Sequence, residues 1–320
     1  MQHTTFSIII PARNMELYIA ETLESVSAQS FGAFEVICID DGSTDRTARI
    51  IEDFSQRDVR FRVVQGLSKG VSAARNLGLT QAKAPFVLFL DADDLLHPEA
   101  LQRYYDTLTR TEAVGALAGV QRMNVDGHVL RGTDNRALVP AQDQLDALLC
   151  KNFVVNGGAL ALRTDSAKRV GGYDESLVKG EDWELWCRLA LLGDFVVVEG
   201  PPLLQYRQVA SGANHQARGS VFARRVPSIQ KVAANADMKA RYGPRLRSLL
   251  RKRQIDIFWS GVRNQYQYGR KSTAVFEGLC GAVLYPDSLL RPKLIWRFLQ
   301  SLDRRANQGT ATPGNSEGRN

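Results

Sequence analysis

Hydrophobic and polar positions alternate in blocks over the first hundred residues. Short apolar runs rich in β-branched and aromatic side chains alternate with stretches in which apolar positions recur every three or four residues. The runs predict buried strands, and the stretches predict amphipathic helices. The predicted strands are residues 6–10, 34–39, 61–64 and 86–90, and the predicted helices are residues 17–28, 44–54, 71–82 and one that opens at Pro98. This pattern predicts an α/β fold whose mostly parallel sheet carries helices on both faces.

Polar side chains follow three of the predicted strands, at the point where each strand ends. They are Pro-Ala-Arg-Asn at 11–14, Asp-Asp-Gly-Ser-Thr-Asp at 40–45 and Asp-Ala-Asp-Asp at 91–94. The carboxyl ends of parallel strands meet at one edge of a sheet, where α/β proteins bind their ligands. We therefore expect these three clusters to form one site.

The acidic clusters have two interpretations each. Asp91 and Asp93 are spaced to share a divalent cation with phosphate oxygens, and a carboxylate at residues 40–41 can accept hydrogen bonds from a nucleobase or a ribose. Glu181 and Asp182 offer a general base beside a predicted helix over residues 182–191. The plainer interpretation of each cluster is a turn or a helix cap.

Charge divides the chain into an acidic and a basic part. Residues 1–215 hold 21 Lys and Arg against 28 Asp and Glu, whereas residues 216–305 hold 19 against 5. We predict a catalytic domain over residues 1–215, a basic helical extension over residues 216–305 and a disordered tail over residues 306–320. The extension either binds an anionic membrane surface or is a solvated or packed helical surface.

Cysteine usage and hydropathy predict the compartment. Four cysteines lie far apart without a Cys-x-x-Cys pair, which is typical of a reducing environment. The first residues lack the basic segment of a signal peptide, and no apolar stretch has the length of a membrane span. We expect a cytoplasmic protein, peripheral on the inner face of the membrane if the extension binds lipid.

The motifs in their order along the chain resemble family 2 glycosyltransferases of the GT-A fold. The resemblance covers residues 6–215 and does not extend into the basic part. The series comprises residues 11–14, residues 40–45, Lys-Gly-Val-Ser-Ala-Ala-Arg-Asn-Leu-Gly at 69–78, Phe-Leu-Asp-Ala-Asp-Asp at 89–94, Gly-Gly-Tyr-Asp-Glu at 171–175 and Glu-Asp at 181–182.

The resemblance implies a Rossmann-like domain that binds a nucleotide-sugar and Mg²⁺ or Mn²⁺. UDP is the expected nucleotide, with GDP and dTDP as open alternatives. The implied donor-binding residues are Pro11, Ala12, Asn14, Asp40, Asp41, Lys69, Arg75, Asp91, Ala92 and Asp93. Asp41, with Asp40 beside it, is similar to the group that reads the base. Asp93 and Asp91 are similar to the metal motif, to which His215 is a further candidate ligand.

The resemblance also implies the reaction. Asp182, with Glu181 in reserve, is similar to the base that deprotonates an acceptor hydroxyl while the sugar leaves its diphosphate, which inverts the anomeric centre. Processive members carry Gln-x-x-Arg-Trp where this chain has Gln-Tyr-Arg-Gln at 205–208. We therefore expect single additions to a saccharide or lipid-linked acceptor, in surface polysaccharide, lipopolysaccharide or glycolipid assembly. Oligomeric state is left open.

Other classes of protein fit the pattern less well. The segment 11–14 contains no glycine, which disfavours a nucleotidyltransferase or a dinucleotide oxidoreductase. Nucleic-acid binding would explain the basic extension but not three acidic clusters at one edge, which repel phosphate when no metal is bound. A non-catalytic relative that binds carbohydrate, or a protein that binds an anionic surface through its extension, are the alternatives left open.

Overall fold

The computed structural model describes residues 4–130, 132, 137–208, 226–268 and 271–286. These residues divide into two compact units. The described residues up to 208 form the first unit together with Pro227–Arg247, and the described residues from Ser248 onward belong to the second. His215 and the predicted tail over residues 306–320 lie outside the described residues.

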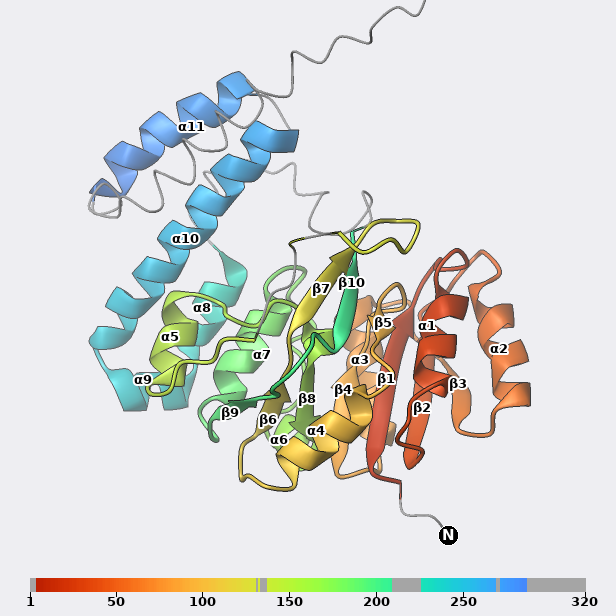
Figure 1. The fold of residues 1–320 in the computed structure, drawn as a ribbon. Helices are drawn as coiled ribbons and strands as arrows, with labels where there is room; N and C mark the ends of the chain where they lie inside the picture. The colour runs from red at the N-terminus through yellow and green to blue at the C-terminus, as the bar shows by residue number, and fades with distance from the viewer. Residues whose placement is uncertain (1–3, 131, 133–136, 209–225, 269–270, 287–320) are drawn as a thin grey trace, which may run out of the picture. The chain divides into compact units, whose positions relative to one another are not determined.

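The first unit is built on a seven-stranded sheet within the described part of the chain (Figure 1). The strands lie in the order β3-β2-β1-β4-β8-β6-β9. Their bounds are β1 Phe6–Ala12, β2 Phe34–Asp40, β3 Phe61–Gln65, β4 Phe86–Phe89, β6 Gly115–Leu117, β8 Leu160–Arg163 and β9 Phe195–Val197. All neighbours pair in parallel except β8, which is antiparallel to β4 and to β6. The predicted mostly parallel sheet is confirmed.

Helices cover both faces of this sheet. The helices of the first unit are α1 Ile19–Ser27, α2 Thr47–Arg57, α3 Val71–Gln81, α4 Ala100–Leu108, α5 Gln144–Cys150, α6 Thr164–Arg169, α7 Glu181–Leu189, α8 Pro227–Ala234 and α9 Ala236–Tyr242, with a 3₁₀ turn at Gly157–Ala159. Figure 1 shows α1 and α4 on one face and α3 and α6 on the other. Each predicted helix of the first hundred residues is present, with ends shifted by up to three residues.

A small second sheet lies beside the main one and contributes to the site. It consists of β5 (Leu95–Leu96), β10 (Leu204–Arg207) and β7 (Val120–Met123), with β10 in the middle. β10 runs antiparallel to β5 and parallel to β7. Because β5 directly follows the acidic cluster at residues 91–94, the pairing of β5 in this sheet fixes the direction in which the chain leaves the cluster.

The prediction that Pro11 ends the first strand is wrong, since β1 continues to Ala12. Successive residues of a strand direct their backbone groups to alternate sides. The Ile9 carbonyl accepts from Leu90 on the β4 side, and the Ala12 carbonyl accepts from Asp41 on the β2 side. Pro11 therefore faces the β4 side, where β4 has already ended, and its missing N–H costs no ladder bond.

Helices α8 and α9 belong to the first unit, although the charge pattern groups them with the basic extension. Two polar contacts explain why. Lys231 Nζ lies 2.8 Å from Asp174 Oδ2, and Tyr242 Oη donates to Asp146 Oδ1 over 2.6 Å. A lysine and a tyrosine of this segment thus bind acidic side chains of the preceding domain.

The second unit contains two helices within the described residues, α10 (Arg245–Tyr268, whose first residues still belong to the first unit) and α11 (Lys271–Leu284). Ile255, Phe258, Trp259 and Val262 form its small apolar core, against which Tyr285 packs. None of the helices in the described ranges has the length and apolarity needed to cross a membrane.

Candidate active site

A buried arginine on α3 joins three of the predicted site carboxylates. The Arg75 side chain is 8% exposed, and its Nη2 lies 2.7 Å from Asp91 Oδ1. Its Nη1 lies 3.4 Å from Asp182 Oδ1 and 4.0 Å from Glu181 Oε1. Burial alone would lower the pKa of Arg75, but Tyr173 and the neighbouring carboxylates outweigh it, so that the pKa is raised. Arg75 therefore stays protonated and links the end of β4 to the start of α7.

The two predicted bases lie at the start of α7. Gly180, with φ of 76°, turns the chain into the helix and places Glu181 and Asp182 in its first turn. Desolvation raises the pKa of Asp182, Arg75 opposes that shift, and Asp91 adds to it. Desolvation, and then the Asp182 charge, also raises the pKa of Glu181. A carboxylate with a raised pKa is a better proton acceptor than an ordinary one, as a general base requires.

The acidic cluster after β4 contains two half-buried carboxylates, Asp91 and Asp93, and one fully buried carboxyl, Asp94. Burial, and then the Asp91 charge, raises the pKa of Asp93 to about 6. Asp94 is fully buried, and its pKa is raised well above the usual range by burial and by both neighbouring aspartates. Its Oδ1 accepts from the Arg207 amide over 2.9 Å and its Oδ2 from Asn156 Nδ2 over 3.0 Å. Asp94 thus holds the loop, while Asp91 and Asp93 face the edge.

The carboxylates at the end of β2 are buried and have different partners. Asp40 Oδ1 accepts from the Ser43 amide over 3.2 Å, which closes a turn. Asp41 Oδ2 accepts from the Gly70 amide over 2.8 Å, whereas Asp41 Oδ1 is buried and has no hydrogen-bond partner among the described residues. An unpaired buried acceptor is costly and marks a position where a ligand donor fits.

Asn14 connects the loop after β1 to the loop after β2. Its backbone has φ of 54°, which Asn adopts more readily than most residues. Asn14 Oδ1 accepts from the backbone amide of Thr44 over 2.8 Å. The backbone amide of Asn14 in turn donates to Ser43 Oγ over 3.1 Å. Ala12 is buried at the end of β1, next to Asp41. The loops after β1 and β2, which carry predicted donor-binding residues, therefore lie together at one edge of the sheet.

The remaining predicted site residues are Lys69 and His215. Lys69 is exposed and precedes Gly70, whose amide binds Asp41. His215 lies outside the described residues. In the described ranges, no group of three or more His, Cys, Asp or Glu side chains is arranged to hold a metal ion. Asp91 and Asp93 supply two carboxylates, and a metal there needs the other oxygens from a diphosphate.

Tyr173 belongs to the site although the sequence pattern did not single it out. Its buried ring lies 5.0 Å from the Arg75 guanidinium. Asn76 binds the Tyr173 backbone on both sides, accepting from its amide over 2.8 Å and donating to its carbonyl over 2.9 Å. The signal in the sequence was Gly171-Gly172, since both glycines have positive φ and turn the chain so that Tyr173 reaches Arg75.

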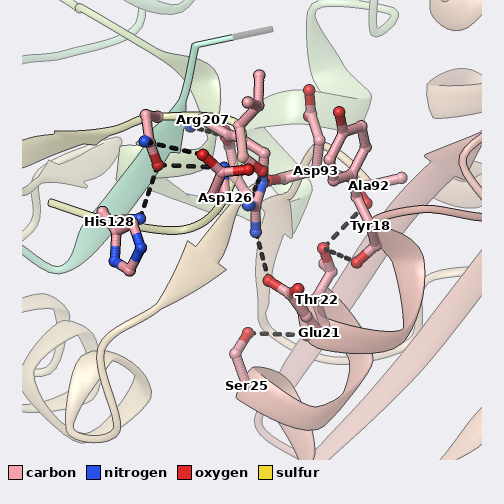
Figure 2. Close-up of polar contacts among 12 residues, drawn as sticks. Tyr18, Glu21, Thr22, Ser25, Ala92, Asp93, Asp126, His128 and Arg207 are labelled. Carbon is pink, nitrogen blue, oxygen red and sulfur yellow. Dashed lines mark hydrogen bonds and ion pairs between the residues drawn. The ribbon is translucent and has the colours of Figure 1, made fainter.

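Arg207 is a second buried arginine that contacts the acidic loop (Figure 2). It is 2% exposed. Its Nε donates to the Asp93 carbonyl over 2.9 Å, and its Nη2 lies 2.6 Å from Glu21 Oε2. In the sequence, Arg207 stands out only in the comparison with the processive motif, because an arginine among polar residues gives no sign of burial.

Fold and site together define an α/β enzyme with an acidic ligand site at the carboxyl edge of a mostly parallel sheet. The model of the family "Glycosyl transferase family 2" matches residues 7–171. The matched part includes Asp40, Asp41, Asp91 and Asp93, for which the sequence predicts roles in binding the base and a metal. The chain therefore belongs to glycosyltransferase family 2 and is a glycosyltransferase.

Named relatives differ in how much of their length the chain spans. The amylovoran biosynthesis glycosyltransferase AmsB of Erwinia amylovora is 28% identical over 225 residues, which are 68% of this chain and 74% of AmsB. The uncharacterized glycosyltransferase EpsJ of Bacillus subtilis is 32% identical over 147 residues, which are 45% of this chain and 40% of EpsJ. The chain thus spans under half the length of EpsJ.

Solved structures show the same GT-A fold. Residues 1–349 of TarS from Staphylococcus aureus, in complex with UDP-GlcNAc, align with a TM-score of 0.60 at 21% identity, over 83% of this chain and 74% of that one. The mannosyltransferase PcManGT from Pyrobaculum calidifontis, in complex with GDP-Man and Mn²⁺, aligns with a TM-score of 0.56 at 16% identity, over 96% of this chain and 88% of that one. At these identities the likeness concerns the fold.

Proposed function

We propose that this glycosyltransferase transfers one sugar from a nucleotide-sugar, with UDP as the nucleotide, to an acceptor hydroxyl, and that the anomeric centre is inverted. The acceptor is a saccharide or a lipid-linked saccharide in the assembly of a surface polysaccharide, lipopolysaccharide or glycolipid. The naming of AmsB as an amylovoran biosynthesis enzyme supports a polysaccharide product. The UDP-GlcNAc complex of TarS supports the UDP donor, and the GDP-Man complex of PcManGT keeps guanine as the competing base.

The observation that carries this proposal is the position of Arg75 between Asp91 and Asp182. One guanidinium contacts both the acidic cluster that suits a diphosphate and the carboxylate that suits an acceptor. This arrangement supports a site in which the leaving group and the nucleophile of a transfer reaction bind within reach of one side chain.

The chain's own groups account for the proton and the direction of attack. Asp182 accepts the proton of the acceptor hydroxyl as its oxygen bonds to the anomeric carbon. The bond from that carbon to the diphosphate oxygen breaks in the same step, and the electron pair leaves with the diphosphate. A single displacement from the opposite face inverts the centre, as in inverting glycosidases. The diphosphate leaves readily, so one base suffices.

The donor-binding groups fit the parts of a nucleotide. The unpaired Asp41 Oδ1 suits a base N–H. Gly66 lies close to that oxygen, because a Cβ at residue 66 would come within 2.8 Å of Asp41 Oδ1 and block the approach of a ligand. Asp91 and Asp93 fit Mg²⁺ or Mn²⁺, since carboxylates are the hard oxygen ligands that these ions prefer, and a bound ion would offset the charge that grows on the diphosphate.

We also propose that the basic part of the chain lies against an anionic membrane surface on the cytoplasmic side, near a lipid-linked acceptor. Residues 216–305 carry its positive charge, and Phe276, Leu279 and Val283 are exposed on α11. Co-sedimentation with phosphatidylglycerol vesicles in low salt, lost in high salt, is the expected result. No sedimentation in low salt would contradict it.

The deciding experiment measures binding and slow hydrolysis of UDP-, GDP- and dTDP-sugars with Mn²⁺, with Mg²⁺ and with a chelator. Wild type, Asp93→Ala and Asp182→Asn are compared. We expect one donor to bind only with metal, Asp93→Ala to lose that binding, and Asp182→Asn to keep binding and lose turnover. Donor binding without turnover in the wild type, even with saccharide acceptors, would favour a non-catalytic relative. No binding of any donor would overturn the proposal.

A further inference from the structure

Arg207 binds three elements that are far apart in the sequence. It is the last residue of β10 and is almost fully buried. Its Nη2 pairs with Glu21 of α1 over 2.6 Å, its Nη1 donates to the Val125 carbonyl over 2.9 Å, and its Nε donates to the Asp93 carbonyl over 2.9 Å. Figure 2 shows the Arg207 side chain between Glu21 and Asp93.

The same loop is held at the residues on either side of Asp93. The Arg207 amide donates to Asp94 Oδ1 over 2.9 Å, and Asn156 donates to Asp94 Oδ2. Thr22 Oγ1 donates to the Ala92 carbonyl over 2.9 Å. Every residue from 92 to 94 is therefore tied to a rigid element, and Arg207 supplies two of these bonds.

Arg207 contacts the main chain of Asp93 and not its carboxylate. The carboxylate stays available for a ligand, while the backbone that aims it is fixed. A buried charge is costly unless it is paired and its donors are satisfied. Three donors here meet three acceptors, an arrangement that suits the planar fork of arginine and not the single ammonium of lysine.

We infer that Arg207, paired with Glu21, is a positioning residue that sets the direction of the Asp93 carboxylate toward a divalent cation and the donor diphosphate. This inference rests on the proposed function, in which Asp93 is a metal ligand. Groups that orient metal ligands from behind alter metal affinity without touching the ion. Glu21 contributes because its charge fixes the guanidinium from the side of α1.

The test compares Arg207→Gln, Arg207→Lys and Glu21→Gln with the wild type. The matched control is Glu99→Gln, because Glu99 pairs with Arg103 and is 53% exposed, close to the 56% of Glu21. Three quantities are measured: the Mn²⁺ concentration at half-maximal UDP binding, the affinity for uridine in a chelator, and the melting temperature. If the binding measurements with UDP-, GDP- and dTDP-sugars show a preference for a GDP-sugar, GDP and guanosine replace UDP and uridine in this test.

We expect Arg207→Gln to raise the Mn²⁺ midpoint about 10-fold to 100-fold. Uridine affinity should stay within about twofold, because the base site lies at β2. Arg207→Lys and Glu21→Gln should shift the midpoint in the same direction by less, and Glu99→Gln should leave it unchanged. If Arg207→Gln does not fold, the Mn²⁺ midpoints of Arg207→Lys and Glu21→Gln decide the test.

Two results would overturn the inference. One is a lower melting temperature with a wild-type Mn²⁺ midpoint, which describes a purely structural arginine. The other is an equal loss of uridine and of Mn²⁺-dependent UDP binding, which describes general distortion. Asp93→Ala separates this failure from that of the proposed function. If wild type binds UDP with Mn²⁺ and Asp93→Ala does not, the metal role stands whatever Arg207 does.

Discussion

Arg75 Nη2 lies 2.7 Å from Asp91 Oδ1, which makes a side chain of α3 the direct partner of the first aspartate after β4. The Arg75 side chain is 8% exposed and that of Asp91 34%, so the arginine is the fixed member of the pair. A ligand that approaches Asp91 from the edge therefore meets a carboxylate held from behind by a buried cation.

Replacing Arg75 by lysine should keep the charge and lose the geometry. A lysine ammonium cannot reach Asp91 and Asp182 in the way that the two nitrogens of a guanidinium do. We expect turnover of the donor to fall on the order of tenfold to a hundredfold, since hydrogen bonds to charged groups are worth about 1.5–3 kcal/mol. Steady-state kinetics with the preferred donor checks this. Turnover equal to that of the wild type would show that Arg75 has only a packing role.

Asp182→Asn should remove the base and spare donor binding. General-base catalysis contributes about 10²–10⁴-fold, and we expect a loss of that size in turnover. Asn is isosteric with Asp and accepts from Arg75 through its amide oxygen, so the fold should persist. An unchanged rate would assign the general-base role to Glu181, and a loss of turnover in Glu181→Gln would then confirm it.

Turnover should decline on the acid side at a higher pH than for an ordinary aspartate. Only the ionised carboxylate accepts a proton, and desolvation raises the pKa of Asp182, so protonation inactivates the base above the usual value of about 3.9. Burial and Asp91 also raise the pKa of Asp93, to about 6. Donor binding must therefore be measured at each pH, and turnover read at saturation. An acid limb at or below the usual value would contradict the assignment.

Gly172→Ala should damage the site more than Gly171→Ala. Both glycines have positive φ, 69° and 82°, so each alanine is strained by about 1–2 kcal/mol. A methyl group at Gly172 would in addition collide with Asn76 Oδ1, which binds the Tyr173 amide, whereas no atom lies within 4 Å at Gly171. We expect both variants to melt earlier, and only Gly172→Ala to lose turnover, because Tyr173 then moves away from Arg75. Equal turnover in the two would exclude this effect.

Asp58→Asn should destabilise the fold in a pH-dependent manner. Hydrogen bonds from the Arg60 side chain, with Nη2 at 2.6 Å from Asp58 Oδ2, lower the pKa of Asp58. A lowered folded-state pKa gives stability that is present above the unfolded value of about 3.9 and is lost as the pH falls through the folded value.

Thermal unfolding across pH tests this. At neutral pH we expect Asp58→Asn to lower the free energy of unfolding by about 1–3 kcal/mol. The gap from the wild type should close below the folded-state pKa. Asp53→Asn is the control, because the exposed Arg49–Asp53 pair, 3.9 Å apart, should be worth only about 0.3–0.5 kcal/mol. A gap that does not change with pH would exclude the charge as its cause.

The first half of the fold could be predicted because hydrophobic periodicity reports burial directly. The ends of elements were less certain, and α2 begins at Thr47 rather than Thr44. Here Asp45 Oδ1 accepts from the Thr47 amide, and Thr44 and Arg46 bind Asn14 and Glu16. The antiparallel insertion of β8 between β4 and β6 could not be predicted, because periodicity carries no information about pairing partners.

The site could be predicted where its chemistry uses acidic residues at a strand end or at a helix start. Asp91 and Asp182, which are far apart in the sequence, do meet around Arg75. Tyr173 and Arg207 were not predicted as site residues, since neither a tyrosine in a glycine-rich turn nor an arginine among polar residues is marked by the sequence as buried. Their burial follows from tertiary contacts, with Asn76 in one case and with Glu21 and Asp93 in the other.

The bonds of Asn14 to Ser43 and Thr44 have a consequence for engineering. The loops after β1 and β2 form one structural unit, because each supplies hydrogen-bond partners for the other. A chimera that imports only the second loop from a relative with another nucleotide preference would leave Asn14, held at φ of 54°, without its acceptor and donor. A change of nucleotide-sugar preference in this protein therefore calls for grafting residues 13–16 and 42–47 together.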